Sequence, residues 1–167
     1  KKALSESSQM LEKFPNSAIL FNIIGASNAG LMQYDAALES YKKALEIRPD
    51  YAEAYFNMGV TLKDKGESEA SFDCYKQALK IKPNYAEAYN NIGNALKNKG
   101  DLEEAIKCYK QALMIKPNYA VAYHNMGNVL EELEKFEEAI QAYNKALSLT
   151  PKEAEIHRKL GTSLMGL

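Results

Sequence analysis

The feature of this sequence that most restricts its fold is the even spacing of its prolines. All five stand 34 residues apart, at Pro15, Pro49, Pro83, Pro117 and Pro151. Five of the glycines keep the same step, at Gly25, Gly59, Gly93, Gly127 and Gly161. A fixed period of this length is typical of architectures in which one small structural unit stacks on the next. We therefore expect the chain to fold as a solenoid.

Each unit is predicted to contain two helices. In the unit 86–119, apolar residues follow a helical spacing in two stretches: Tyr89, Ile92 and Leu96, then Leu102, Ala105, Ile106, Tyr109, Ala112 and Leu113. Gly100 lies between the two stretches and suits a left-handed residue at the end of the first helix. Pro117 is expected to end the second helix. The pattern indicates a helix–turn–helix unit.

Small residues recur where the helices are expected to touch. Two antiparallel helices approach closely only where no bulky side chain lies between them. The glycine column and the column of Ala37, Ala105 and Ala139 are predicted to mark the crossing within a pair. Asn84 and Glu87, three residues apart, resemble a capping box for the first helix of the unit.

Together these marks resemble the tetratricopeptide repeat, a family built from 34-residue helix–turn–helix units. The residues that carry the resemblance are Tyr89, Ile92, Gly93, Ala105, Tyr109, Ala112 and Pro117, and they recur in register along the whole chain. The resemblance implies an all-α solenoid of stacked antiparallel helix pairs that forms a right-handed superhelix. It also implies a scaffold that binds other proteins and has no catalytic chemistry of its own.

The same register divides residues 1–167 as a single solenoid fragment. Complete repeats are expected at 18–51, 52–85, 86–119 and 120–153. Residues 1–17 are then the second helix of an earlier repeat, and residues 154–167 are the first helix of a further one. The last helix would carry an apolar stripe of Leu160, Leu164 and Leu167. Such a stripe favours a longer array or end-to-end association of two copies.

Composition excludes several classes of function. The formal net charge is -1 at pH 7, whereas a nucleic-acid-binding domain usually has a basic patch. No apolar run approaches the roughly 18 residues of a membrane span. The two histidines, His124 and His157, lack the spacing of a metal site, so no metal, cofactor or catalytic residue is expected. The low cysteine content mildly favours a reducing compartment, and hence the cytoplasm.

Asparagines form the candidate binding site. They recur on the first helices, opposite the apolar stripe, although asparagine is a mediocre helix former. An amide offers two donors and an acceptor, so it can pair with both the N–H and the C=O of an extended peptide. The predicted peptide-binding residues are Asn57, Asn91, Asn125, Asn90, Asn94, Asn128, Phe56, Lys63, Lys97, His124, Glu131 and Lys159. A purely solvated face remains the alternative.

The resemblance supports the binding hypothesis. In this family the first helices line a concave groove, and a comparable asparagine column lines the repeat arm of the protein O-linked N-acetylglucosamine transferase. The carboxylate clamp of chaperone-binding members fits less well, because Phe56, Asn90 and His124 occupy the column of its first lysine. The expected function is a protein-interaction scaffold. The alternatives are the substrate-recruiting arm of a glycosyltransferase or sulfotransferase, and a self-assembly module.

The first repeat offers a different wall to a partner. Its exposed face is predicted to contain Asn22, Ile23, Ala26, Ala29 and Gly30. Small apolar side chains leave room on a helix surface, so this end could accept a bulky apolar side chain. A weak, fraying helix is the alternative.

Overall fold

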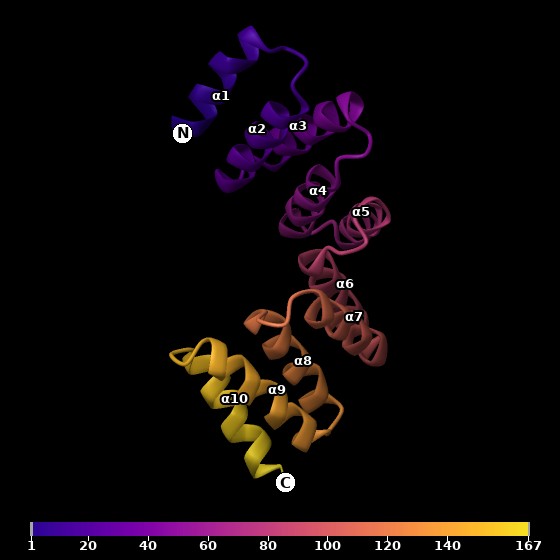
Figure 1. Ribbon diagram of the computed structural model, residues 1–167, viewed down its shortest axis with the longest axis vertical. Coiled ribbons are helices and arrows are strands. Elements are labelled where there is room, and N and C mark those ends of the chain that lie inside the picture. Colours follow the sequence, from indigo (N-terminus) through magenta and orange to yellow (C-terminus); the bar gives the residue numbers. More distant parts are fainter. Residues whose placement is uncertain (1, 167) are drawn as a thin grey trace. The chain divides into compact units, whose positions relative to one another are not determined.

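The computed structural model describes residues 2–166, with side chains described at residues 7 and 9–166. These residues form only helices and no strand (Figure 1). The helices are α1 (Lys2–Lys13), α2 (Ala18–Gly30), α3 (Tyr34–Ile47), α4 (Ala52–Lys65), α5 (Ser68–Ile81), α6 (Ala86–Lys99), α7 (Leu102–Ile115), α8 (Ala120–Glu132), α9 (Phe136–Leu149) and α10 (Ala154–Met165). The predicted all-α fold is confirmed.

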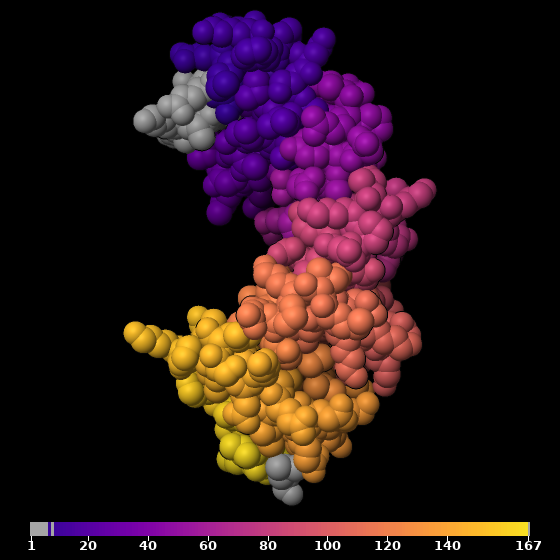
Figure 2. Space-filling view, viewed as in Figure 1, coloured from indigo at the N-terminus to yellow at the C-terminus, as the bar shows by residue number. Residues whose placement is uncertain are grey.

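The helices pack as hairpins within two compact units, Lys1–Pro83 and Asn84–Leu167. In the first unit, α2 packs on α3 and α4 on α5, while α3 also contacts α4. In the second unit, α6 packs on α7 and α8 on α9, and α9 also contacts α10. The space-filling view shows that side chains close the space between consecutive hairpins inside each unit (Figure 2). Each unit is therefore a stack of antiparallel helix pairs.

A glycine on the first helix and a tyrosine on the second hold each hairpin together. A Cβ atom built on Gly93 would lie 2.6 Å from Cε1 of Tyr109, whose side chain is fully buried. The same contact recurs in the other hairpins, at Gly25 with Tyr41, Gly59 with Tyr75, and Gly127 with Tyr143. The tyrosine ring thus occupies the volume that the glycine leaves free. This confirms the predicted helix crossing at the glycine column.

The turn inside each hairpin needs one residue in the left-handed region. Gly100 takes this conformation with φ 86°, as the sequence predicted, and Gly66 takes it with φ 93°. One repeat away, the same position is filled by Met32 at φ 59° and Glu134 at φ 57°. A side chain there costs about 1–2 kcal/mol relative to glycine. The turn geometry is therefore kept even where the residue does not favour it.

The predicted capping box is wrong. Tyr85 precedes α6, and no side chain caps that helix. Glu87 instead binds Lys116, with its Oε1 2.7 Å from the lysine Nζ at the end of α7. Glu53 and Lys82 form the equivalent ion pair at 2.9 Å in the hairpin of α4 and α5.

The apolar stripe predicted for the last helix is only partly buried. Leu160 packs against the core formed by α7, α8 and α9, whereas Leu164 is exposed. Leu167 lies outside the described residues. Leu164 and the neighbouring Met165 therefore add exposed apolar surface to α10.

The glycine–tyrosine contact predicts opposite effects for two substitutions in one column. Gly93→Ala should lower the free energy of unfolding by about 1–3 kcal/mol, because the new methyl group meets the rigid ring of Tyr109. Gly161→Ala should be neutral or stabilising by up to about 1 kcal/mol, because no atom lies within 4 Å of the added Cβ. Urea unfolding followed by circular dichroism measures both. Equal effects at the two sites would contradict this role of the tyrosine.

Candidate functional site

Asparagine side chains connect the first helices of successive hairpins. In the first unit, the Nδ2 of Asn57 on α4 donates to the Oδ1 of Asn22 on α2 at 3.0 Å. Asn22 then donates from its own Nδ2 to the hydroxyl of Tyr51 at 3.3 Å. The first helices of this unit thus share one wall, called here the amide wall of unit 1.

The second unit repeats this arrangement. The Nδ2 of Asn125 on α8 donates to the Oδ1 of Asn90 on α6 at 3.0 Å. Asn90 is 3% exposed, and its Nδ2 lies 3.4 Å from the Oδ1 of Asn91. Asn90 therefore positions the other two amides and is too buried to contact a ligand itself. We call this the amide wall of unit 2.

The bonds between helices leave part of each amide available. Asn57 and Asn125 each use one N–H of the amide. Among the described residues, nothing donates to the Oδ1 of either side chain, and both are half-buried. Each amide retains a carbonyl acceptor and one N–H donor, the two groups that a peptide backbone requires.

The amide wall of unit 2 also includes a second asparagine column, Asn94 and Asn128, which buried tyrosines orient. The hydroxyl of Tyr109 donates to the Oδ1 of Asn94 at 2.8 Å, and the hydroxyl of Tyr143 lies 2.9 Å from the Oδ1 of Asn128. Burial raises the pKa of both phenols, so they remain protonated donors near neutral pH. Since the carbonyl oxygen is occupied, the NH₂ group of Asn94 is the part left for a ligand.

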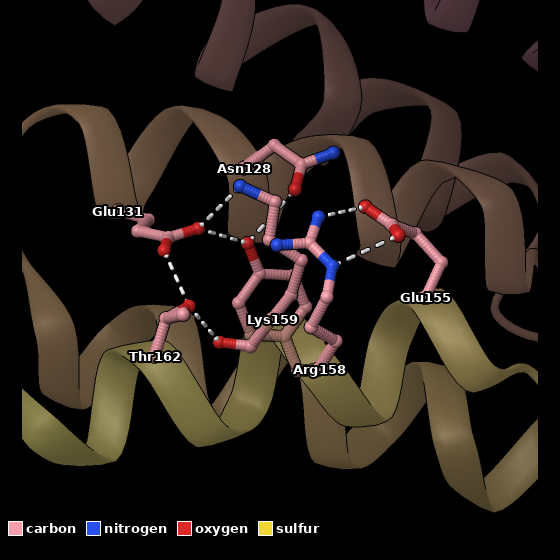
Figure 3. A network of polar contacts seen from close by, with 7 residues as sticks. Asn128, Glu131, Glu155, Arg158, Lys159 and Thr162 are labelled. Carbon is pink, nitrogen blue, oxygen red and sulfur yellow. Dashed lines mark hydrogen bonds and ion pairs between the residues drawn. The ribbon is translucent and has the colours of Figure 1, made fainter.

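The carboxylate of Glu131 on α8 is the centre of a polar network with α10 (Figure 3). It accepts from the Nζ of Lys159 at 3.0 Å and from the hydroxyl of Thr162 at 2.7 Å. The hydroxyl of Tyr143, 2.9 Å away, shares its one hydrogen between Glu131 and Asn128. Burial raises the pKa of Glu131, but these hydrogen bonds outweigh it and hold the pKa below the usual value.

A cavity of about 320 Å³ opens on the amide wall of unit 2. It is lined by Lys97 on α6, by Asn128, Glu131 and Glu132 on α8, and by Lys159 on α10. Lys159 is held by Glu131, whereas Lys97 forms no ion pair with any described residue. The ammonium of Lys97 and the amide of Asn128 are therefore the groups that face the cavity with unused donors.

Three further residues predicted for the site, Phe56, Lys63 and His124, do not line this cavity. The ring of Phe56 is half-buried, 5.8 Å from the ring of Tyr75. Lys63 is exposed and lies 3.2 Å from the carboxylate of Asp64. Burial lowers the pKa of His124, and its Nε2 has no hydrogen-bond partner among the described residues. The neutral imidazole is therefore favoured there.

The sequence did not predict the partners that orient these side chains. Asn22 was placed on the wall of the first repeat but was not paired with Asn57, and Tyr51, Tyr143 and Thr162 were not identified as part of the site. One signal could have found the pairing of Asn22 with Asn57, since both amide pairs are separated by 35 residues, one more than the repeat. An amide on one first helix therefore bonds to the residue that stands one position further along the repeat on the first helix of the following hairpin.

The exposed side of α2 has a different character. Ile23 is 40% exposed, and Ala26 and Gly30 are also exposed. No charged residue occurs in this helix. A helix that is apolar on most sides normally has its surface covered. The face of unit 1 beside Asn57 thus offers apolar surface with little steric bulk.

Neither metal chemistry nor a membrane span is indicated by the described residues. Within the described part of the chain, no three histidine, cysteine or acidic side chains converge in a way that could hold a metal ion. None of the described helices has the length and apolar character needed to cross a bilayer. The amide walls offer a ligand hydrogen-bonding groups, charged groups and apolar surface.

Comparison with known proteins identifies the repeats as tetratricopeptide repeats. Two family descriptions match: "Tetratricopeptide repeat" over residues 84–152, and "TPR repeat" over residues 33–66 and 61–100. A peroxisomal targeting signal receptor from Candida albicans is 40% identical over 47 residues, which is 28% of this chain and 8% of the receptor. A probable UDP-N-acetylglucosamine–peptide N-acetylglucosaminyltransferase from Arabidopsis thaliana is 36% identical over 68 residues, 41% of this chain and 7% of that protein. The chain thus spans less than a tenth of either relative.

Solved structures show the same fold over most of the chain. A crystal structure of MamA superimposes with a TM-score of 0.80 at 26% identity and covers 89% of this chain and 81% of that one. YrrB, described as a TPR protein with an unusual peptide-binding site, gives a TM-score of 0.78 at 19% identity and covers 95% of this chain and 82% of its own. At that identity the likeness to YrrB concerns the fold alone.

The network of Glu131 predicts a stability that depends on pH. Its folded-state pKa is lowered, so its contribution is present above the ordinary glutamate pKa and is lost as the pH falls through the folded value. Glu131→Gln should lower the free energy of unfolding by about 1–2 kcal/mol at neutral pH and by much less at about pH 3. Urea unfolding at both pH values measures the difference.

Glu132→Gln is the matched control, because Glu132 is the exposed neighbour on the same helix. Its free energy of unfolding should equal that of the parent protein at both pH values. If Glu131→Gln is equally destabilising in acid and at neutrality, the ionised carboxylate is not the source of the stability.

Proposed function

Because the chain belongs to the tetratricopeptide repeat family, we propose that it binds an extended segment of a partner protein along the amide walls of its first helices. The observation that carries this proposal is the set of hydrogen-bonding groups that the fold fixes in place without using. In unit 2 these are the NH₂ group of Asn94, the carbonyl of Asn125 and the ammonium of Lys97. In unit 1 it is the carbonyl of Asn57.

The chemistry of a peptide backbone matches these groups. An extended chain rises about 3.3 Å per residue, and packed helices lie about 8–10 Å apart, so consecutive first helices would meet roughly every third residue. Carbonyl groups of the peptide would accept from Asn94, and its N–H groups would donate to Asn125. Such contacts hold a backbone with little regard to its sequence.

Selectivity would come from the surroundings of the amides. In unit 2 the cavity beside Lys97 favours a partner side chain with an acceptor group, such as a carboxylate or an amide. In unit 1 the surface of Ile23 and Ala26 favours an apolar side chain. The two units would therefore recognise different kinds of side chain.

Rigid placement makes this recognition efficient. Tyr109 orients Asn94, and Asn90 orients Asn125, before any ligand arrives. A pre-oriented amide loses less conformational entropy on binding than a free surface side chain does. The similarity to a peroxisomal targeting signal receptor supports a role in recognising a segment of another protein.

A second candidate is the substrate-recruiting arm of a larger enzyme. The similarity to the Arabidopsis transferase over 41% of this chain favours it. The proposed contacts are the same in both cases, but the bound segment would then be a substrate of an attached catalytic domain. A self-assembly module is a third possibility, supported by the exposed Leu164 and Met165 of α10.

Removing the oriented amides should weaken peptide binding. The probe is the tightest ligand selected from an array of unrelated synthetic peptides, with its Kd measured by fluorescence anisotropy. The double variant Asn94→Ala with Asn128→Ala should raise that Kd about tenfold, because two hydrogen bonds to the backbone are lost. Urea unfolding checks that the variant remains folded.

The matched control lies on the second helices. Gln111 on α7 and Asn144 on α9 are exposed side chains of the same chemistry. Their double change to Ala should leave the Kd unaltered. Equal Kd values for the two double variants would exclude the amide wall of unit 2 as the binding surface.

A further inference from the structure

A separate cavity lies at an edge of unit 1, where α1 ends, α2 begins and α3 ends. It has a volume of about 620 Å³. Its apolar lining includes Phe14, Ile19 and Ile47, each of which is at least 40% exposed. Two cations, Lys13 and Arg48, also line it, and no acidic side chain is among its described lining residues. The lining of the cavity thus combines exposed apolar surface with two positive charges.

Two later hairpins have an ion pair at the equivalent position, whereas the hairpin of α8 and α9 has Val121 and Thr150 there. In the hairpin of α4 and α5, Glu53 pairs with Lys82 at 2.9 Å. In the hairpin of α6 and α7, Glu87 pairs with Lys116 at 2.7 Å. Each pair joins the start of a first helix to the residue that follows the second helix. A carboxylate is therefore the ordinary partner of the cation in this column.

The first hairpin lacks that carboxylate. One repeat before Glu53 stands Ile19, and one repeat before Lys82 stands Arg48. The structure gives Arg48 no ion pair within residues 9–166. Its guanidinium lies 4.8 Å from the centre of the Tyr51 ring. The ring covers one face of the planar guanidinium, so the N–H groups along the guanidinium edge remain available to another partner.

A second departure from the repeat reduces the bulk of the lining. Ser17 stands where later repeats have Tyr51, Tyr85 and Tyr119. It caps α2 by accepting from the backbone N–H of Leu20 at 3.3 Å, so its hydroxyl is used locally. A small side chain at this place leaves the neighbouring apolar groups uncovered.

We propose that this cavity binds a partner peptide in which an aromatic side chain stands next to an aspartate or glutamate. The ring would pack on Phe14, Ile19 and Ile47, and the carboxylate would take the place at Arg48 that Glu53 and Glu87 fill for the lysines of later hairpins. An Arg–carboxylate contact is charge-assisted and commonly bidentate. An aromatic side chain buries more apolar surface than other side chains do.

Both parts of this ligand are needed. A carboxylate alone would leave the apolar lining in contact with water, and an aromatic ring alone would approach Arg48 without neutralising it. The nearest carboxylate on α4, Glu53, is held by Lys82 and acts on Arg48 only through its field. None of the residues that line the cavity belongs to an amide wall, so the proposal does not rest on the proposed function.

The test uses the whole chain and a short fluorescein-labelled peptide with one phenylalanine flanked by glutamates, followed by fluorescence anisotropy. Arg48→Gln should raise the Kd about tenfold, because the charged half of the contact is lost. Ile19→Glu should weaken binding at least as much, because it restores the carboxylate that pairs with this column in later hairpins. Circular dichroism melting checks that both variants are folded.

Two controls distinguish this cavity from the rest of the surface. Lys82→Gln removes the cation of the same column in the next hairpin and should leave the Kd unchanged. Gln111→Ala with Asn144→Ala, on exposed side chains of α7 and α9, should also leave it unchanged. Replacing the peptide's phenylalanine by alanine, or its glutamates by glutamine, should each weaken binding.

Other outcomes would overturn the proposal. One is an unchanged Kd in both Arg48→Gln and Ile19→Glu. Another is loss of binding only in the variant of the amide wall. A third is that decanoate displaces the peptide and binds the chain more tightly than the peptide does. The occupant of the cavity would then be a lipid carboxylate and not a partner protein.

Discussion

The contact between a first-helix glycine and a second-helix tyrosine is the constraint on which the structure depends. At Gly93 and Tyr109 the ring fills the position that a Cβ atom would need, so the two helices can cross closely. The buried ring then reaches through the hairpin, and its hydroxyl meets Asn94 on the first helix. One residue thus sets the spacing of the hairpin and orients a polar side chain of the proposed binding surface.

Because packing depends on these few columns, a repeat can vary its surface residues without changing its fold. The packing columns stay constant, whereas the position that receives the tyrosine hydroxyl at Asn94 and Asn128 is occupied by Ala26 and Val60 in the two earlier repeats. Between hairpins the amide pairs Asn22–Asn57 and Asn90–Asn125 add a second fixed connection. Where the repeat departs from its own pattern, as at Ile19, a group such as Arg48 is left without its usual partner, and the surface acquires a new chemical preference.

The sequence was sufficient for the fold because its packing residues recur with a fixed step. Periodicity located the helix pairs, the glycine crossing and the left-handed turn at Gly100. Residue propensity alone does not predict Met32 and Glu134 in that conformation, because a side chain disfavours it and the surrounding hairpin imposes it. Glu87 was also misassigned to a helix cap, since the lysine that binds it lies 29 residues away in the chain.

The candidate site was less predictable than the fold. Asn90 was expected at the surface and is buried, and Glu131 is tied into a network with Tyr143 and Thr162. Side-chain chemistry was thus readable from the sequence, whereas accessibility and orientation required the structure.

If the fold orients amides to contact the backbone of a bound partner, their own signals should report the contact. Side-chain amide signals in ¹H–¹⁵N correlation NMR spectra test this most directly, during titration with a peptide that binds the chain. We expect the largest shifts for the NH₂ groups of Asn94, Asn125 and Asn128, with those of Gln111 and Asn144 unmoved. Shifts confined to the second helices, with the first-helix amides unchanged, would contradict the proposed role of the amide walls.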